Sequence, residues 1–209
     1  MVIECRSQPS LFGGGAPALD PSLAGVRRIH LGRGAWVDHR PGWIEGHQAV
    51  FEILWSAMRW RLERRQMYDR VVDVPRLVAS VPEDGPGHPV LGQVAEALSA
   101  RYARSLRSVS LAAYRDGRDS VAFHGDRIGR ESAFTVVAIV SFGAPRRFLL
   151  RPAGGGTSRA FELGWGDLLV MGGTCQRTWE HGIPKVAEAG LRISAQFRPD
   201  GPADVDEAA

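Results

Sequence analysis

The sequence has little cysteine, a single lysine and no long apolar run. Its two cysteines, Cys5 and Cys175, are too few for a disulfide framework or a cysteine-rich zinc site, so a metal in this chain would be held by histidine and carboxylate. No window approaches the roughly 18 consecutive apolar residues of a transmembrane helix, and the opening MVIECRSQPS lacks the charged and apolar regions of a signal peptide. We therefore expect a cytoplasmic protein without a membrane partner.

The basic side chains of this sequence are almost all arginine. Lys185 is the only lysine, so all other basic residues are arginines, and the formal net charge is +3. Guanidinium forks suit phosphate groups, but a genome that favours arginine codons explains the same bias. Because the field depends on where the charges lie, net charge does not decide whether the partner is a nucleic acid.

The chain is long enough for one domain with a sizeable core, since 44% of its 209 residues are hydrophobic. Residues 1–25 and 200–209 are rich in Gly, Pro and Ala without a sustained period, which predicts a flexible N-terminal arm, draped over the core or partly disordered, and a flexible tail. Residues 26–199 are then a single domain, which we expect to be monomeric. Within it, the apolar spacing predicts helices over about 46–62 and 88–103.

The apolar period changes to two from about residue 106 onward. Turn residues separate strand-like runs there, namely SVSLAAY, FTVVAIVSF, RRFLLRP, RAFEL, DLLVMGG and LRISAQFR. A series of short strands after an N-terminal helical layer predicts a mainly β fold with flanking helices, as in a β-sandwich or jelly roll.

The stretch VAFHGD places His124 and Asp126 two residues apart at the end of an apolar run. In a strand such residues point to the same face, so both side chains can converge on one ion. The segment between Asp126 and His181, in WEHGIPK, is long enough for four or five strands, so the chain can return to the same site. Two histidines and one carboxylate form the facial triad of non-haem Fe(II) oxygenases. The same three ligands would also suit Zn(II). Alternatively, the histidines lie at these positions by chance and bind no metal.

The run LRISAQFR has one wholly polar face. Its polar residues alternate with Ile193, Ala195 and Phe197 and are Arg192, Ser194, Gln196 and Arg198. A strand that exposes this face to water would have the same pattern. With the triad, however, Arg192 would lie where a short loop returns an antiparallel strand beside the metal. Its guanidinium fork can bind the distal carboxylate of 2-oxoglutarate, with Ser194 adding a hydrogen bond.

The runs LAAYRDGRDSVAFHGD, GDLLVMGGTCQRTWEHGIPK and LRISAQFR together resemble the AlkB family of Fe(II)- and 2-oxoglutarate-dependent dioxygenases, over about residues 106–199. The segments GAWVDHRPGW and MYDRVVDVPR are similar to its N-terminal part, less specifically. The resemblance implies a double-stranded β-helix (jelly roll) with iron on His124, Asp126 and His181.

The same resemblance implies roles for further residues. Tyr114, Arg192 and Ser194 match the family's 2-oxoglutarate site, and Arg198 matches an arginine beside the iron-binding Asp126 and the substrate. Many members have asparagine where this chain has Ala112 and Ser194, which removes one co-substrate contact at Ala112. The segment PRLVASVPEDG also lacks the aromatic residues that often follow PR in members that act on nucleic acids.

The resemblance implies that O2 and 2-oxoglutarate are used to demethylate bases such as 1-methyladenine and 3-methylcytosine, in direct reversal repair of DNA. The substrate would be single-stranded or flipped out of a duplex, and RNA is an alternative. Trp179 is expected to share the face of His181 and stack on the base, or else to pack the barrel mouth. Two alternatives remain open: an oxygenase acting on RNA, protein or a small molecule, and a non-catalytic β-barrel binding module.

Overall fold

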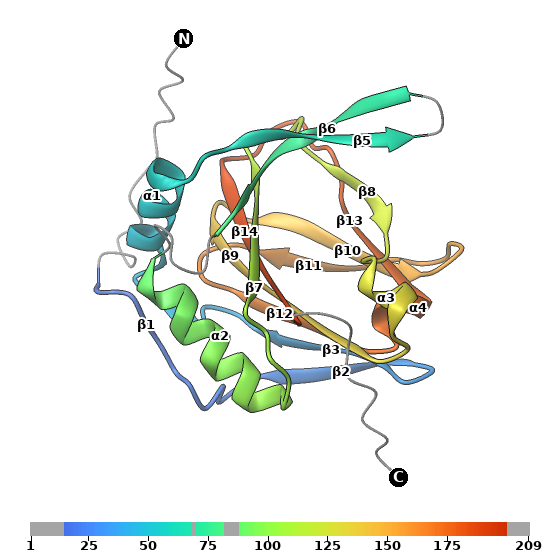
Figure 1. Cartoon of the computed structure of the whole chain (residues 1–209), viewed down its shortest axis with the longest axis horizontal. Helices are drawn as coiled ribbons and strands as arrows, with labels where there is room; N and C mark the ends of the chain where they lie inside the picture. The colour runs from blue at the N-terminus through green and yellow to red at the C-terminus, as the bar shows by residue number, and fades with distance from the viewer. Residues whose placement is uncertain (1–14, 68–69, 82–87, 200–209) are drawn as a thin grey trace.

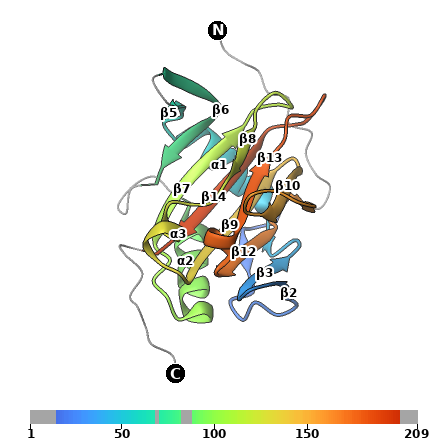
Figure 2. The ribbon, with the colours of Figure 1, turned by 90° about the vertical axis from the view of Figure 1, so that its right-hand side faces the viewer.

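The computed structural model describes residues 15–67, 70–81 and 88–199 of the chain. Two antiparallel β-sheets face each other, and two helices cover the outer face of the larger one (Figures 1 and 2). The prediction of a mainly β fold with flanking helices is confirmed, and the arrangement is that of a double-stranded β-helix.

The larger sheet has eight strands and the smaller has four. The larger runs, in spatial order, through β2 (Arg27–Gly32), β3 (Ala35–Arg40), β12 (Leu168–Gly173), β9 (Thr135–Gly143), β14 (Arg192–Arg198), β7 (Ser108–Tyr114), β6 (Arg70–Ser80) and β5 (Arg61–Met67). The smaller consists of β11 (Arg159–Leu163), β10 (Arg146–Pro152), β13 (Trp179–Ile183) and β8 (Val121–His124). The short strands β1 (Ala18–Leu19) and β4 (Ile44–Glu45) form a separate two-stranded sheet. The helices are α1 (His47–Ala57), α2 (Pro89–Tyr102), α3 (Ile128–Glu131) and α4 (Cys175–Thr178).

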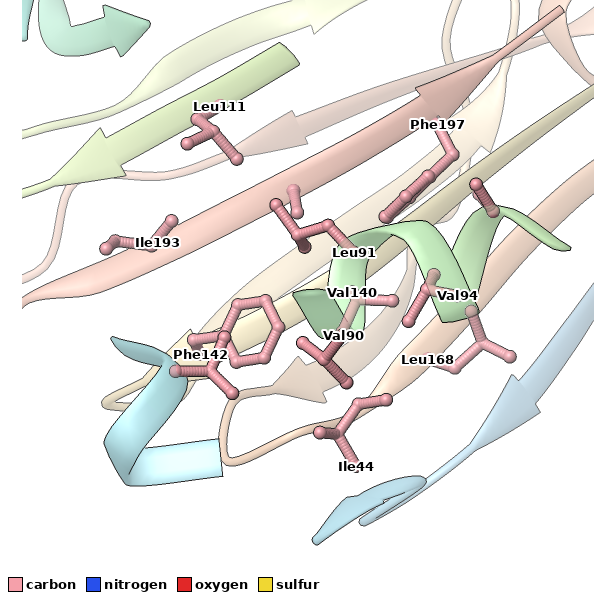
Figure 3. Packing of buried hydrophobic residues seen from close by; sticks show 14 of the residues in the cluster. Ile44, Val90, Leu91, Val94, Leu111, Val140, Phe142, Leu168, Ile193 and Phe197 are labelled. Atoms are coloured by element: carbon pink, nitrogen blue, oxygen red, sulfur yellow. The ribbon is translucent and has the colours of Figure 1, made fainter. Parts of the chain in front are cut away.

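Alternate side chains of the central strands enter two different cores. In β9, Val140 and Phe142 join an outer core beneath the helices, whereas Val137 and Ile139 join an inner core between the sheets. Figure 3 shows the outer core, where α2 packs against side chains of the larger sheet. Because both faces of β9 are covered, the strand reads as a continuous apolar run in the sequence.

The ends of α2 follow from local signals. The His88 side chain accepts a hydrogen bond from the Val90 amide at 3.1 Å, and Pro89 occupies the first turn, where its missing N–H is no loss. The helix ends at Tyr102, and the C-cap residue Ala103 has a left-handed conformation with φ of 49°. The predicted range of 88–103 therefore agrees closely with the structure.

The first predicted helix is shorter than expected. It ends at Ala57 because the chain turns extended at Met58 and residues 61–67 form β5, which pairs with β6 as a hairpin at the edge of the larger sheet (Figure 1). None of the described helices combines the length and apolar content needed to cross a membrane.

Part of the predicted N-terminal arm lies on the core. Strand β1 pairs with β4, Leu23 is only 3% exposed, and the Trp43 indole donates to the carbonyl of Asp20 at 2.9 Å. These anchors are single residues without a period, so the sequence pattern gave no sign of them. Residues 1–14 of the predicted arm and the whole predicted tail, 200–209, lie outside the described residues.

Candidate active site

The three residues of the predicted triad converge at one end of the smaller sheet. His124 ends β8 and pairs directly with His181 of β13, and their rings are 4.4 Å apart. Asp126 Oδ1 lies 3.8 Å from His124 Nε2 and 3.7 Å from His181 Nε2. One ligand atom from each residue lies within 4.8 Å of the other two, a compact set for one ion. Asp126 itself lies beyond the end of β8, in the turn before α3, rather than on a strand as the sequence reasoning assumed.

The two oxygens of Asp126 have different partners. Oδ2 forms an ion pair with Arg198 at 3.1 Å, which leaves Oδ1 facing the two histidines. Arg198 is held in turn by Ser110 Oγ and Gln196 Oε1, each at 2.8 Å. Burial raises the pKa of the Asp126 carboxyl, but the Arg198 guanidinium and the two neighbouring imidazoles together more than offset this effect, so the pKa lies below its ordinary value. The carboxylate is therefore ionised at neutral pH.

Both imidazoles are suited to bind a metal. Burial lowers the pKa of His181 to about 3, so its ring is neutral at physiological pH. His124 Nδ1 lies 2.9 Å from the Ala122 carbonyl, and a proton donated there leaves the Nε2 lone pair facing Asp126. Two imidazoles and one carboxylate fit the donor set of non-haem Fe(II).

The buried histidine gives a prediction for the metal-free protein. His181 takes up a proton near pH 6.5 when unfolded but only near pH 3 when folded, so acid favours the unfolded state below about pH 6.5. Burial also lowers the pKa of His39 and His47, which acts in the same direction. In EDTA, the free energy of unfolding in urea should fall by about 1–2 kcal/mol from pH 7 to pH 5. An unchanged value would contradict this assignment, and His181→Gln should weaken the dependence.

A cavity of about 700 Å³ opens beside the triad. Its wall includes three residues of the polar face of β14, namely Ser194, Gln196 and Arg198, and the opposite face of that strand packs in the outer core. The polar face therefore points inward rather than to bulk solvent. The remaining lining residues are Arg76, Tyr114, Val121, His124, Gly125, Asp126, Arg127, Val137, Ile139, Phe148, Met171, His181 and Ile183.

Arg192 lies in a different place from the one its sequence position suggested. Strand β14 pairs with β7 and β9 in the larger sheet, not with β13, so Arg192 stands opposite Tyr114. The side chain is fully buried behind the cavity wall, with Cζ 5.5 Å from the Tyr114 ring centre.

The guanidinium of Arg192 is only partly satisfied. Nε donates to the Leu163 carbonyl at 3.1 Å and Nη2 to Ser141 Oγ at 2.7 Å, whereas the buried Nη1 has no hydrogen-bond partner. Burial lowers its pKa to about 10, so it stays cationic, and no described carboxylate forms an ion pair with it. A buried, unpaired cation is costly unless a ligand supplies the anion. The distal carboxylate of 2-oxoglutarate fits this requirement.

Two arginines next to Tyr114 were missed by the sequence reasoning. Arg76 of β6 is 7% exposed, lines the cavity and donates from Nη1 to the Tyr114 hydroxyl at 3.2 Å. Arg146 of β10 is 2% exposed, and its Nη1 and Nη2 donate to three backbone carbonyls, those of Asp116, Asp119 and Pro184, each at 2.8 Å. A charged residue within an apolar run, as in VPRLV, was the available signal for Arg76.

Trp179 is not where the stacking prediction required. Its ring packs against the inner core and is not part of the cavity wall. The residue begins β13 directly after α4 and is only partly buried. The aromatic side chains on the cavity wall, apart from the two triad histidines, are instead Tyr114 and Phe148, and Phe148 stacks on His181 with ring centres 5.4 Å apart.

Comparisons with known proteins agree with this geometry. Residues 60–198 match the model of the 2OG-Fe(II) oxygenase superfamily. Alpha-ketoglutarate-dependent dioxygenase alkB homolog 3 of Bos taurus is 30% identical over 182 residues, which cover 76% of this chain and 64% of that protein. The Mus musculus protein of the same name is 29% identical over 95% of this chain and 75% of its own length. DNA oxidative demethylase ALKBH2 of Bos taurus is 29% identical over 66% of this chain and 57% of its length.

Solved structures share the fold at low identity. The structure of OsALKBH1 matches with a TM-score of 0.56 and 13% identity, covering 83% of this chain and all of that one. A 2OG-Fe(II) oxygenase family protein from Burkholderia pseudomallei also gives a TM-score of 0.56 at 13% identity, over 80% of this chain and 87% of its own. At this identity the likeness concerns the fold alone.

Proposed function

The chain belongs to the 2OG-Fe(II) oxygenase superfamily, and on this premise we propose that it demethylates alkylated nucleic-acid bases oxidatively, acting on single-stranded DNA. It is an Fe(II)- and 2-oxoglutarate-dependent dioxygenase similar to alkB homolog 3 and ALKBH2. The name of ALKBH2 describes a DNA oxidative demethylase, and this likeness motivates the base as substrate.

The observation that carries the proposal is the cavity in which the triad lies beside two of the expected co-substrate residues, Tyr114 and Ser194. Its volume of about 700 Å³ is within the range of small-molecule sites, which suits a base beside the metal. His124, Asp126 and His181 would hold Fe(II), and Arg192, opposite Tyr114, would hold the distal carboxylate of 2-oxoglutarate. The donor set of the triad and the unpartnered Nη1 of Arg192 support these roles.

When bound, iron and 2-oxoglutarate supply the activation of O2, which oxidises an N-methyl group while 2-oxoglutarate is converted to succinate and CO2. The hydroxylated methyl group leaves as formaldehyde: the C–N electron pair stays on the base nitrogen, which becomes neutral, and the hydroxyl proton is released to solvent. Arg198 keeps Asp126 ionised and oriented. The protein thus contributes the orientation of the reacting groups.

The charge of the cavity supports a polyanionic substrate. Three guanidinium groups, those of Arg76, Arg127 and Arg198, line it against one carboxylate, Asp126, which Arg198 already neutralises. Asp126 is therefore not free to attract a cationic methylated base. Arg127 is exposed at the rim and is suited to contact a phosphate of the strand.

A second candidate is an oxygenase for another substrate, such as modified RNA, a protein side chain or a small anion. The position of Trp179 favours this alternative, because the indole expected to stack on the base is absent from the cavity wall. The two candidates share the iron site and differ only in the molecule that stimulates turnover.

We expect succinate and formaldehyde release with single-stranded oligonucleotides that contain 1-methyladenine or 3-methylcytosine, and slower release from the matched duplexes. Flipping a base out of a duplex costs a few kcal/mol. In a single strand the base is already unpaired, so most of this cost does not arise. The association constant for the oligonucleotide should fall as the salt concentration rises. Arg127→Gln should reduce the slope of its logarithm against the logarithm of the salt concentration by about 0.7. Methylated RNA and unmethylated DNA serve as comparisons. If no methylated oligonucleotide raises succinate above the uncoupled background, the second candidate takes its place.

A further inference from the structure

Asp126 is the triad residue whose position the sheets do not fix. The pairing of β8 with β13 reaches His124 and His181, but β8 ends at His124 and α3 begins only at Ile128. Asp126 lies in the turn between these two elements. A metal ligand must be held within about 0.5 Å of its working position, so contacts outside the strand ladder must hold this turn.

The side chain of Gln176 makes such a contact. It is 5% exposed, and its Oε1 accepts a hydrogen bond from the Asp126 backbone N–H at 2.9 Å. The amide nitrogen faces Met171 Sδ at 3.5 Å, which agrees with the assignment of the oxygen toward the N–H donor. Gln176 belongs to α4, which leads directly into β13 and thus to His181. One amide therefore connects the segments that carry two of the three ligands.

The turn also packs directly on the backbone of Gln176. A Cβ atom on Gly125 would lie 2.6 Å from the Gln176 carbonyl oxygen, and a Cβ on Gly129 would collide with the same oxygen. Both positions therefore need glycine for the close approach. Helices α3 and α4 lie side by side in Figure 1, which agrees with these contacts.

We propose that Gln176 is a positioning residue for the metal centre. Its amide fixes the Asp126 backbone relative to His181, so that Oδ1 faces both imidazoles while Oδ2 remains on Arg198. Gln176 acts through Asp126 and does not bind the metal itself. Partners of this kind typically change metal affinity by about 10–100-fold when they are removed.

The test compares three variants by titrating the metal-free protein with Co(II). Gln176→Met keeps the length of the side chain but removes the amide, and should weaken Co(II) binding by about 10–100-fold and alter the d–d spectrum at saturation. Gln176→Glu keeps an acceptor oxygen and should restore affinity and spectrum to near wild type. Cys175→Ala is the matched control, because it removes a buried side chain of the same helix without touching the amide. It should lower thermal stability and leave Co(II) affinity unchanged.

Two results would overturn the proposal. One is wild-type Co(II) affinity and spectrum in Gln176→Met. The other is an equal loss of affinity in Cys175→Ala at equal destabilisation, which would show that α4 contributes only to stability. Should Gln176→Met not fold, hydrogen exchange in the wild-type apo protein decides: the Asp126 amide should be protected although it lies outside any strand, and exchange at the rate of an unfolded chain would refute the contact.

Discussion

Replacing His181 by alanine should abolish 2-oxoglutarate turnover, and His124→Ala should do the same. Each imidazole presents Nε2 within 4 Å of Asp126 Oδ1, so either change removes one of three ligands. The loss should exceed the roughly 10–100-fold effect of removing a partner outside the coordination sphere. Fe(II) affinity should fall in parallel, measured by anaerobic titration, while far-ultraviolet circular dichroism stays near wild type.

His30→Ala is a suitable control for this experiment. His30 is exposed on β2, at the far edge of the larger sheet, and its loss should change neither iron binding nor turnover. If the His181 variant binds stoichiometric Fe(II) and turns over normally, the assignment of the ligands is wrong.

Arg192→Lys should raise the dissociation constant for 2-oxoglutarate by about ten- to a hundredfold. Lysine keeps the charge but lacks the fork that places the unpartnered Nη1 beside two satisfied nitrogens. A charge-assisted contact is worth roughly 1.5–3 kcal/mol, which corresponds to this change. Fe(II) affinity should barely change, because Arg192 is on the opposite sheet from the two histidines.

The variant also loses the contacts of Arg192 with Leu163 and Ser141, so its stability is measured alongside. Arg159→Lys, an exposed change on β11, gives the control for the substitution type. An unchanged 2-oxoglutarate constant in a folded Arg192→Lys protein would remove this arginine from the co-substrate site.

Much of the fold was predictable because the strands in the C-terminal half follow a period of two. The runs SVSLAAY, RRFLLRP and RAFEL coincide with β7, β10 and β11. In β14 the alternation of polar and apolar residues correctly separated the cavity face from the core face. The triad was predictable for a related reason, since HxD at a strand end and a distal histidine need only one antiparallel pairing to meet.

Other features depend on tertiary contacts that leave no local pattern. The β5–β6 hairpin escaped prediction because its stability comes from pairing with β7, far along the chain. Sequence distance suggested that Arg192 follows His181 on a neighbouring strand, but the chain crosses to the other sheet between them. Trp179 has the alternation expected of a cavity residue, yet its ring packs against the inner core and does not line the cavity.

We propose that this site couples 2-oxoglutarate oxidation to removal of a methyl group from a nucleic-acid base. The decisive experiment follows one reaction with a single-stranded oligonucleotide containing one 1-methyladenine, at saturating Fe(II) and 2-oxoglutarate. Formaldehyde, succinate and the mass of the oligonucleotide are measured together. We expect equal amounts of formaldehyde and oligonucleotide-dependent succinate, with a matching loss of one methyl group. Succinate formation that is unaffected by the oligonucleotide, with its methyl group retained, would show that the base is not the substrate.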